Sequence, residues 1–107
     1  HLHTEALRLL NLEGDLRRAL NRQEFEPFFQ SIVRLSDGAV LGYESLVRWR
    51  HPERGLIAPD EFLAVAEDNG SVEQIDWMML DRTCQALPAL TAEGGYVCIN
   101  LSTRHFR

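Results

Sequence analysis

The stretch that decides the fold of this chain is Glu44-Ser45-Leu46-Val47-Arg48-Trp49-Arg50-His51-Pro52. Side chains alternate between the two faces of a β-strand, so Glu44, Leu46 and Arg48 share one face. Charged side chains rarely face a core unless they are paired or bound. The Cα atoms of Glu44 and Arg48 should lie roughly 13 Å apart, which suits two ends of one ligand better than an ion pair. An edge strand whose polar face meets water is the alternative.

Two extended segments on either side of a turn predict a β-hairpin that contains this stretch. Residues 25–35 are rich in Phe, Ile and Val, and residues 39–50 form the return strand. Asp37-Gly38 between them is a hairpin-type turn, so the two strands should pair antiparallel. Residues 51–58, which contain Pro52 and Gly55, are expected to form a loop.

Two helices are predicted after this loop. Pro59 suits the first turn of a helix that stops by Gly70. Ser71 and Gln74 have the spacing of a capping box for the next helix, which Pro88 ends or kinks. The apolar face of this second helix is predicted to carry Val72, Ile75, Met79, Leu80, Cys84 and Leu87.

A further strand closes the pattern. Gly94-Gly95 turns the chain into a strand over residues 96–101. The alternation of strand, helix and strand predicts a right-handed crossover that places this strand parallel to a neighbour. The sequence therefore predicts an α/β fold.

Several motifs, in this order and spacing, closely resemble the N-terminal part of EAL domains. They are Phe28-Phe29-Gln30-Ser31-Ile32-Val33, Asp37-Gly38, Gly42-Tyr43-Glu44-Ser45-Leu46, Gly55-Leu56-Ile57-Ala58-Pro59-Asp60-Glu61-Phe62 and Val97-Cys98-Ile99-Asn100-Leu101-Ser102. The resemblance runs from about Leu16 to the last residue. Two departures are Ser45, where the family has Ala in Glu-Ala-Leu, and Ser31, where it has Pro in Gln-Pro-Ile. Because Ser45 faces away from Glu44, we expect it to adjust packing and to leave the ligand chemistry alone.

The resemblance implies a fold and a domain arrangement. Residues 15–107 would form the N-terminal part of an EAL domain, a partial TIM-like (β/α) barrel with an antiparallel first strand. Such barrels typically need about 250 residues, so we expect a longer parent protein. Residues 2–22 have helical periodicity interrupted by Gly14, and residues 1–14 are expected to be a linker helix from an upstream GGDEF or sensory domain. An ordinary surface helix of the barrel is the alternative.

The resemblance also implies an activity and its residues. EAL domains are known as phosphodiesterases that hydrolyse cyclic di-GMP with Mg²⁺ or Mn²⁺. The matching positions are Glu44 as catalytic residue and metal ligand, Asn100 as metal ligand, and Gln30, Glu44, Leu46 and Arg48 as substrate-binding residues. Oxygen ligands suit these metals, and the Arg48 guanidinium suits a phosphate. Each position also has a structural alternative: a helix cap for Asn100, a surface ion pair for Arg48, an ordinary polar strand residue for Gln30 and core packing for Leu46.

Residues that the family also needs are absent from this sequence. A later glutamate, a consecutive aspartate pair, a lysine and a further glutamate would lie beyond residue 107, and all eleven basic residues here are Arg. We therefore expect the parent to be an enzyme and this chain alone to be inactive. A non-catalytic cyclic di-GMP receptor or a dimerisation module is the alternative. An open sheet edge would favour self-association of the chain as a dimer.

Composition constrains the binding partners and the cellular location that we expect for the protein. A net charge of −5 argues against nonspecific binding to a nucleic acid polymer or an anionic membrane. No apolar run approaches the roughly 20 residues of a membrane span, and no signal peptide is present, so we expect a cytoplasmic segment. Cys84 and Cys98 are interpreted as small buried hydrophobic residues with reduced thiols, and a disulfide between them is the alternative. Trp49, Trp77 and Phe62 are predicted to be core residues.

Overall fold

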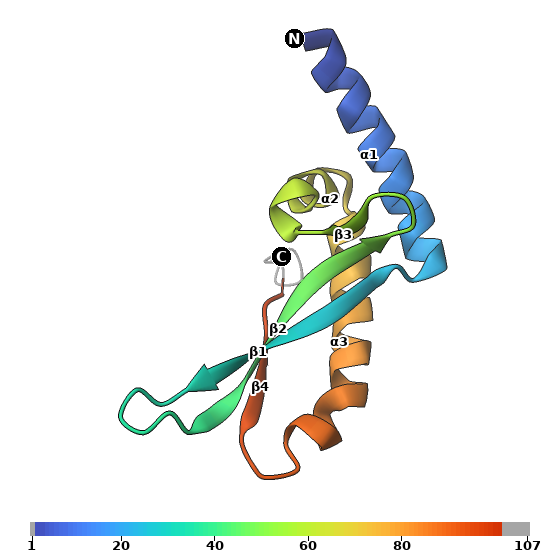
Figure 1. Ribbon diagram of the computed structural model, residues 1–107. Coiled ribbons are helices and arrows are strands. Elements are labelled where there is room, and N and C mark those ends of the chain that lie inside the picture. The colour runs from blue at the N-terminus through green and yellow to red at the C-terminus, as the bar shows by residue number, and fades with distance from the viewer. Residues whose placement is uncertain (1, 102–107) are drawn as a thin grey trace.

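The computed structural model describes residues 2–101, and side chains from residue 11 onward (Figure 1). Its elements, in order, are α1 (Leu2–Arg22), β1 (Phe25–Val33), β2 (Val40–His51), β3 (Gly55–Ile57), the 3-10 turn η1 (Pro59–Glu61), α2 (Leu63–Asn69), α3 (Ser71–Leu90) and β4 (Tyr96–Ile99). In the sheet, β2 pairs antiparallel with β1 and β3, and parallel with β4. The α/β prediction is confirmed, and the structure adds β3 and η1 to the predicted elements.

The predicted hairpin forms β1 and β2, and its turn projects beyond the helices in Figure 1. Gly38 has a positive φ of 72°, a conformation that favours glycine. The Asp37 carboxylate accepts a hydrogen bond from the Ala39 backbone N–H at 3.0 Å. The resulting register places Gln30 opposite Glu44. The turn and the register shift between Ile32 and Val33 together decide which β1 side chain lies opposite Glu44.

The predicted parallel neighbour of β4 is β2. Glu44 lies opposite Cys98 and Ser45 opposite Ile99 in the parallel register. The two backbones approach closely at Gly42, where an added Cβ would overlap the Tyr96 carbonyl oxygen. This position therefore excludes any larger residue without displacement of β4.

The loop expected over residues 51–58 contains a short strand instead. β3 turns back onto the end of β2, with His51 opposite Gly55. His51 Nδ1 accepts hydrogen bonds from the backbone N–H groups of Glu53 at 3.0 Å and Arg54 at 3.1 Å. This side-chain acceptor closes the turn, and Gly55 follows it with φ of 74°. Pro52 and Gly55 therefore mark a tight hairpin.

Trp49 is a core residue, as predicted. Its ring is fully buried and lies 5.4 Å from the centroid of Phe25 and 5.6 Å from that of Phe62. The indole N–H donates to the Glu24 carboxylate at 3.0 Å, which satisfies the one polar atom of the ring. Leu12 and Leu16 of α1 are buried in the same core. Both Trp49 and Phe62 are confirmed as core residues.

The helix boundaries differ in detail from the prediction. Gly70, with φ of 83°, separates α2 from α3 as expected. The capping box is not formed, because the Asn69 carboxamide oxygen instead accepts from the Ser71 N–H at 2.9 Å. Pro59 opens η1, and α2 begins only at Leu63. Pro88 lies inside α3, which runs on to Leu90.

The buried face of α3 is rotated relative to the predicted one. Val72, Ile75 and Met79 are buried as expected, but Cys84 and Leu87 are exposed, and Asp76 and Thr83 are buried in their place. The prediction that Trp77 is a core residue is wrong, since Trp77 is 62% exposed. A helix turns 100° per residue, so positions 77 and 84 point away from the stripe that meets the sheet.

The prediction that both cysteines are buried is also wrong. Cys84 and Cys98 are exposed free thiols. Cys98 lies on the sheet face opposite α3, and the described residues leave that face open.

Among the described helices, none combines the length and the apolar character that a membrane span requires.

A buried hydrogen bond joins β2 to α3 directly behind Glu44. Ser45 Oγ lies 2.9 Å from Thr83 Oγ1, and the two residues are 3% and 2% exposed. Replacing one partner leaves a buried hydroxyl without its bond. We expect Ser45→Ala and Thr83→Val each to lower the free energy of unfolding by about 1–3 kcal/mol. The double variant should lose less than the sum of the two, which denaturant unfolding would measure. Additive losses would contradict the coupling.

The glycine at the crossing of β2 and β4 gives a second test of the fold. Gly42→Ala should destabilise the protein by about 1–3 kcal/mol, because the new methyl group meets backbone atoms that cannot rotate away. Gly14→Ala is the matched control, since a Cβ there has an ordinary 3.6 Å contact with Arg18 Nη1. Within a helix that change should stabilise by about 0.5–1 kcal/mol. Thermal denaturation of both variants measures the two changes in stability. Equal changes for Gly42→Ala and Gly14→Ala would show that β4 does not pack against β2 as described.

Candidate functional site

The predicted site residues lie on the face of the sheet that points away from α3. Ser45 and Trp49 are buried toward the helices, so the alternate residues of β2 take the other face. The strand registers bring residues of β1 and β4 beside them. We call this surface the open face; its residues are Glu26, Phe28, Gln30, Glu44, Leu46, Arg48, Arg50, Cys98 and Asn100.

Glu44 and Asn100 meet at the centre of the open face. Cys98 is level with Glu44 in the parallel register, and Asn100 lies two residues further, just past the end of β4. The Asn100 Nδ2 group donates to Glu44 Oε2 at 3.2 Å. This bond leaves Asn100 Oδ1 and Glu44 Oε1 as acceptors at the same point. Two residues that are 56 positions apart in sequence thus present a pair of oxygen ligands.

These oxygens fit a hard divalent cation in type but not in number. Carboxylate and amide oxygens are the ligands that Mg²⁺ and Mn²⁺ prefer. Within the described part of the chain, no group of three or more His, Cys, Asp or Glu side chains is arranged to hold a metal ion. Glu44 and Asn100 therefore supply too few ligands, by themselves, to hold such an ion.

Arg48 lies on the same face, four residues along β2 from Glu44. Its Nη1 group donates to the Val47 carbonyl oxygen at 2.8 Å. Its Cζ atom lies 5.8 Å from the centroid of the Phe28 ring. The guanidinium keeps its other N–H donors for an anion, and it is half-buried.

A second arginine on this face has a carboxylate partner. Arg50 Nε donates to Glu26 Oε1 at 3.1 Å, and Arg50 Nη2 contacts the same oxygen. The hydrogen bond to Glu26 and the charge of that carboxylate raise the pKa of Arg50 above its ordinary value. Arg50 therefore stays charged, and Glu26 is occupied by it, although Glu26 lies directly opposite Arg48 in the register.

The two other predicted substrate-binding residues border Glu44. Gln30 is exposed and lies directly across from it on β1. Leu46 is half-buried, between Glu44 and Arg48 along β2. The structure thus brings all five predicted residues to one face. It adds Phe28, which the sequence reasoning missed as a site residue, although strand alternation from Gln30 places it there.

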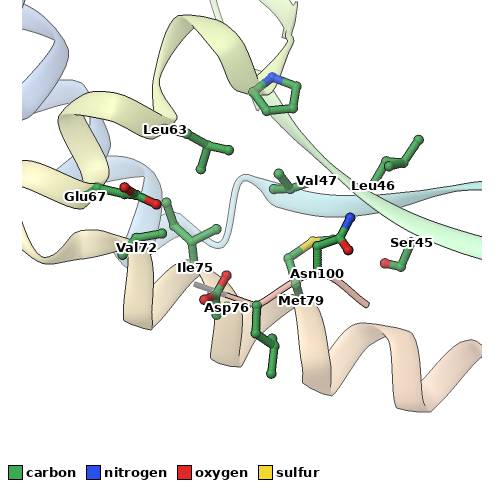
Figure 2. Close-up of a pocket in the computed structure, with 12 residues that line it drawn as sticks. Ser45, Leu46, Val47, Leu63, Glu67, Val72, Ile75, Asp76, Met79 and Asn100 are labelled. Carbon is green, nitrogen blue, oxygen red and sulfur yellow. The ribbon is translucent and has the colours of Figure 1, made fainter. Parts of the chain in front are cut away.

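A cavity of about 230 Å³ reaches the edge of this site. Figure 2 shows it between β2, α2 and α3, with Val47, Leu63, Ile75 and Met79 around it. It meets the predicted residues only at Leu46 and Asn100, and Glu44 does not line it. The cavity is therefore largely a packing space on the helix side, set apart from Glu44, Gln30 and Arg48, which do not line it.

Comparisons with known proteins agree with this geometry. The family model described as EAL domain matches residues 13–107. The chain is 43% identical over 93 residues to "Cyclic di-GMP phosphodiesterase NbdA" of Pseudomonas aeruginosa, covering 87% of this chain and 12% of that protein. It is 37% identical over 109 residues to "Bifunctional diguanylate cyclase/cyclic di-GMP phosphodiesterase MucR" of the same species, covering 98% of this chain and 16% of that protein. The chain therefore spans less than a fifth of the length of these curated relatives.

Solved structures show the same fold. The "PaMucR Phosphodiesterase, c-di-GMP complex" superposes with a TM-score of 0.79 at 37% identity, over 90% of this chain and 40% of that one. The EAL enzyme Bd1971 in its cGMP-bound form gives 0.76 at 30% identity, over 97% of this chain and 31% of that one. These neighbours are EAL domains of the TIM-barrel type, so the prediction of a partial barrel is confirmed. This chain belongs to the EAL domain family and is homologous to cyclic di-GMP phosphodiesterases.

Proposed function

We propose that this segment is the N-terminal part of a metal-dependent cyclic di-GMP phosphodiesterase that acts in bacterial second-messenger signalling. The observation that carries the proposal is the contact between Asn100 and Glu44 on the open face, with Arg48 on the same face. Oxygen ligands and a guanidinium are the groups that suit, respectively, a divalent metal ion and a phosphate. The family membership supports the same substrate.

Each residue of the proposed site has a role that suits its functional group. Glu44 and Asn100 would hold a Mg²⁺ or Mn²⁺ ion through Oε1 and Oδ1. When bound, such an ion lowers the pKa of a coordinated water and neutralises phosphate charge. Arg48 donates parallel hydrogen bonds to phosphate oxygens of the substrate. Gln30 offers a donor and an acceptor to a guanine edge or a phosphate, and Leu46 provides an apolar wall.

The rest of the machinery belongs to the parent protein. The additional carboxylates and a lysine would come from residues outside this sequence, so the isolated 107-residue chain should not hydrolyse cyclic di-GMP. Helix α1 would connect residues 15–107 to an upstream GGDEF or sensory domain, with residues 1–14 as the linker. The segment itself would be cytoplasmic and would contact neither a membrane nor a nucleic acid polymer.

Kinetics of the full-length parent test the proposed roles. Glu44→Gln and Asn100→Ala should each lower kcat by roughly 100-fold or more, since loss of even an outer-shell metal partner costs about 10- to 100-fold. Arg48→Ala should instead raise KM by roughly ten- to a hundred-fold, through the lost charge-assisted hydrogen bonds. Formation of the linear dinucleotide in Mg²⁺ or Mn²⁺ buffer is the assay.

Exposed residues of the same type provide the controls: Glu61→Gln, Asn21→Ala and Arg17→Ala should leave the kinetics unchanged. Wild-type kinetics in all three site variants would place the site elsewhere. A parent that binds cyclic di-GMP through Arg48 but lacks turnover in the wild type would instead be a non-catalytic receptor.

The open edge of β4 supports a second proposal, self-association of the isolated chain. Within the described residues β4 pairs only with β2, and Phe28, Leu56 and Tyr96 are exposed apolar side chains. An unpaired strand edge beside apolar surface favours association, most simply as a two-fold dimer. Light scattering coupled to size exclusion, over a dilution series, should show a concentration-dependent mass. A monomer at every concentration, with protected amides in β4, would contradict it.

A further inference from the structure

The aromatic ring of Phe28 lies on the open face of the sheet, outside the buried core. Phe28 is 38% exposed on the open face, whereas its neighbour Phe29 takes the opposite face. In the antiparallel register Phe28 is level with Leu46, so Arg48 is its diagonal neighbour on β2. Diagonal positions are within reach of aromatic and long side chains. The guanidinium carbon of Arg48 accordingly lies 5.8 Å from the ring centroid, within cation–π range.

The charges around Arg48 leave it available for an external anion. Glu26 lies directly across from Arg48, yet its carboxylate binds Arg50. Among the described side chains Arg48 has no ion pair, and its one hydrogen bond goes to the Val47 carbonyl. A carboxylate on Arg48 would compete with a phosphate, whereas an aromatic ring does not. The Phe28 ring therefore attracts the cation without occupying its hydrogen-bond donors.

We infer that Phe28 is the positioning residue for the Arg48 guanidinium in the recognition of a substrate phosphate. The inference rests on the proposed function of Arg48. The ring restricts the long arginine side chain before the ligand arrives, which lowers the conformational entropy lost on binding. Phe28 should thus affect substrate affinity through Arg48 and should leave the chemical step unchanged.

Direct binding measurements on the full-length protein test this role. Cyclic di-GMP is titrated calorimetrically in EDTA, because the proposed hydrolysis requires a divalent metal ion and the ligand is then not consumed. Phe28→Leu keeps an apolar side chain but removes the ring, and it should weaken binding about two- to five-fold, the size of an exposed cation–π interaction. Phe28→Tyr retains the ring and should restore the reference Kd. In the otherwise wild-type enzyme, Phe28→Leu should raise KM by the same factor with kcat unchanged.

A double-mutant cycle separates positioning from direct contact with the ligand. In an Arg48→Ala background, Phe28→Leu should leave the Kd unchanged, because the residue acts only through the arginine. Phe29→Leu is the matched control: the neighbouring ring lies across from Ser45 on the helix side, so its loss should lower stability without weakening binding. If Phe28→Leu fails to fold, Phe28→Met takes its place with the same expectations.

The outcomes distinguish this inference from the proposed function. If Arg48→Ala weakens binding and Phe28→Leu does not, the inference is wrong and the proposed function stands. Equal weakening by Phe28→Leu with and without Arg48 would also overturn positioning, since the ring would then act on the ligand itself. If Arg48→Ala has no effect on affinity, the proposed function of Arg48 fails, and the inference fails with it.

Discussion

The parallel pairing of β4 with β2 is the constraint on which the rest of this structure depends. It places Asn100 beside Glu44 across 56 positions of sequence. Close approach of the two backbones is permitted by Gly42, where a side chain would overlap Tyr96, and by Gly95, where a Cβ would lie 2.7 Å from the Leu41 carbonyl oxygen. Without this pairing the chain would retain its hairpin and its aromatic core but would lose the oxygen pair.

The two faces of β2 separate stability from chemistry. Toward the helices, Trp49 anchors the aromatic core, and Ser45 bonds to Thr83 in α3. On the open face, Glu44 and Arg48 are half-buried, and both belong to the proposed site. The Ser45 hydroxyl, at the position where the family usually has alanine, bonds to Thr83 on the helix side and so lies away from the open face. Single-residue alternation along one strand is therefore enough to keep the two tasks apart.

The sequence predicted those features that depend on local chemistry. Asp37-Gly38 set the hairpin, alternation over residues 43–49 set the faces of β2, and Asn100 was expected at the end of its strand. The features that failed depend on contacts between distant segments. The exposure of Trp77 and Cys84 depends on which side of α3 packs against the sheet. Helical periodicity alone could not define that side narrowly enough to exclude these two residues. Cys98 sits on a sheet face that is usually buried in a parallel sheet. The bond between Ser45 and Thr83 links residues 38 positions apart. The metal and substrate roles of the five site residues stay predictions that rest on the family and on their shared face.

The central claim is that Glu44 and Asn100 form one corner of a divalent metal site. Anomalous scattering from Mn²⁺, in crystals of the full-length protein grown with cyclic di-GMP, measures this directly. The account predicts a manganese peak bonded to a Glu44 carboxylate oxygen and to Asn100 Oδ1, at roughly the 2.0–2.3 Å expected for oxygen ligands of such ions. A fully occupied manganese site that includes neither residue would contradict it.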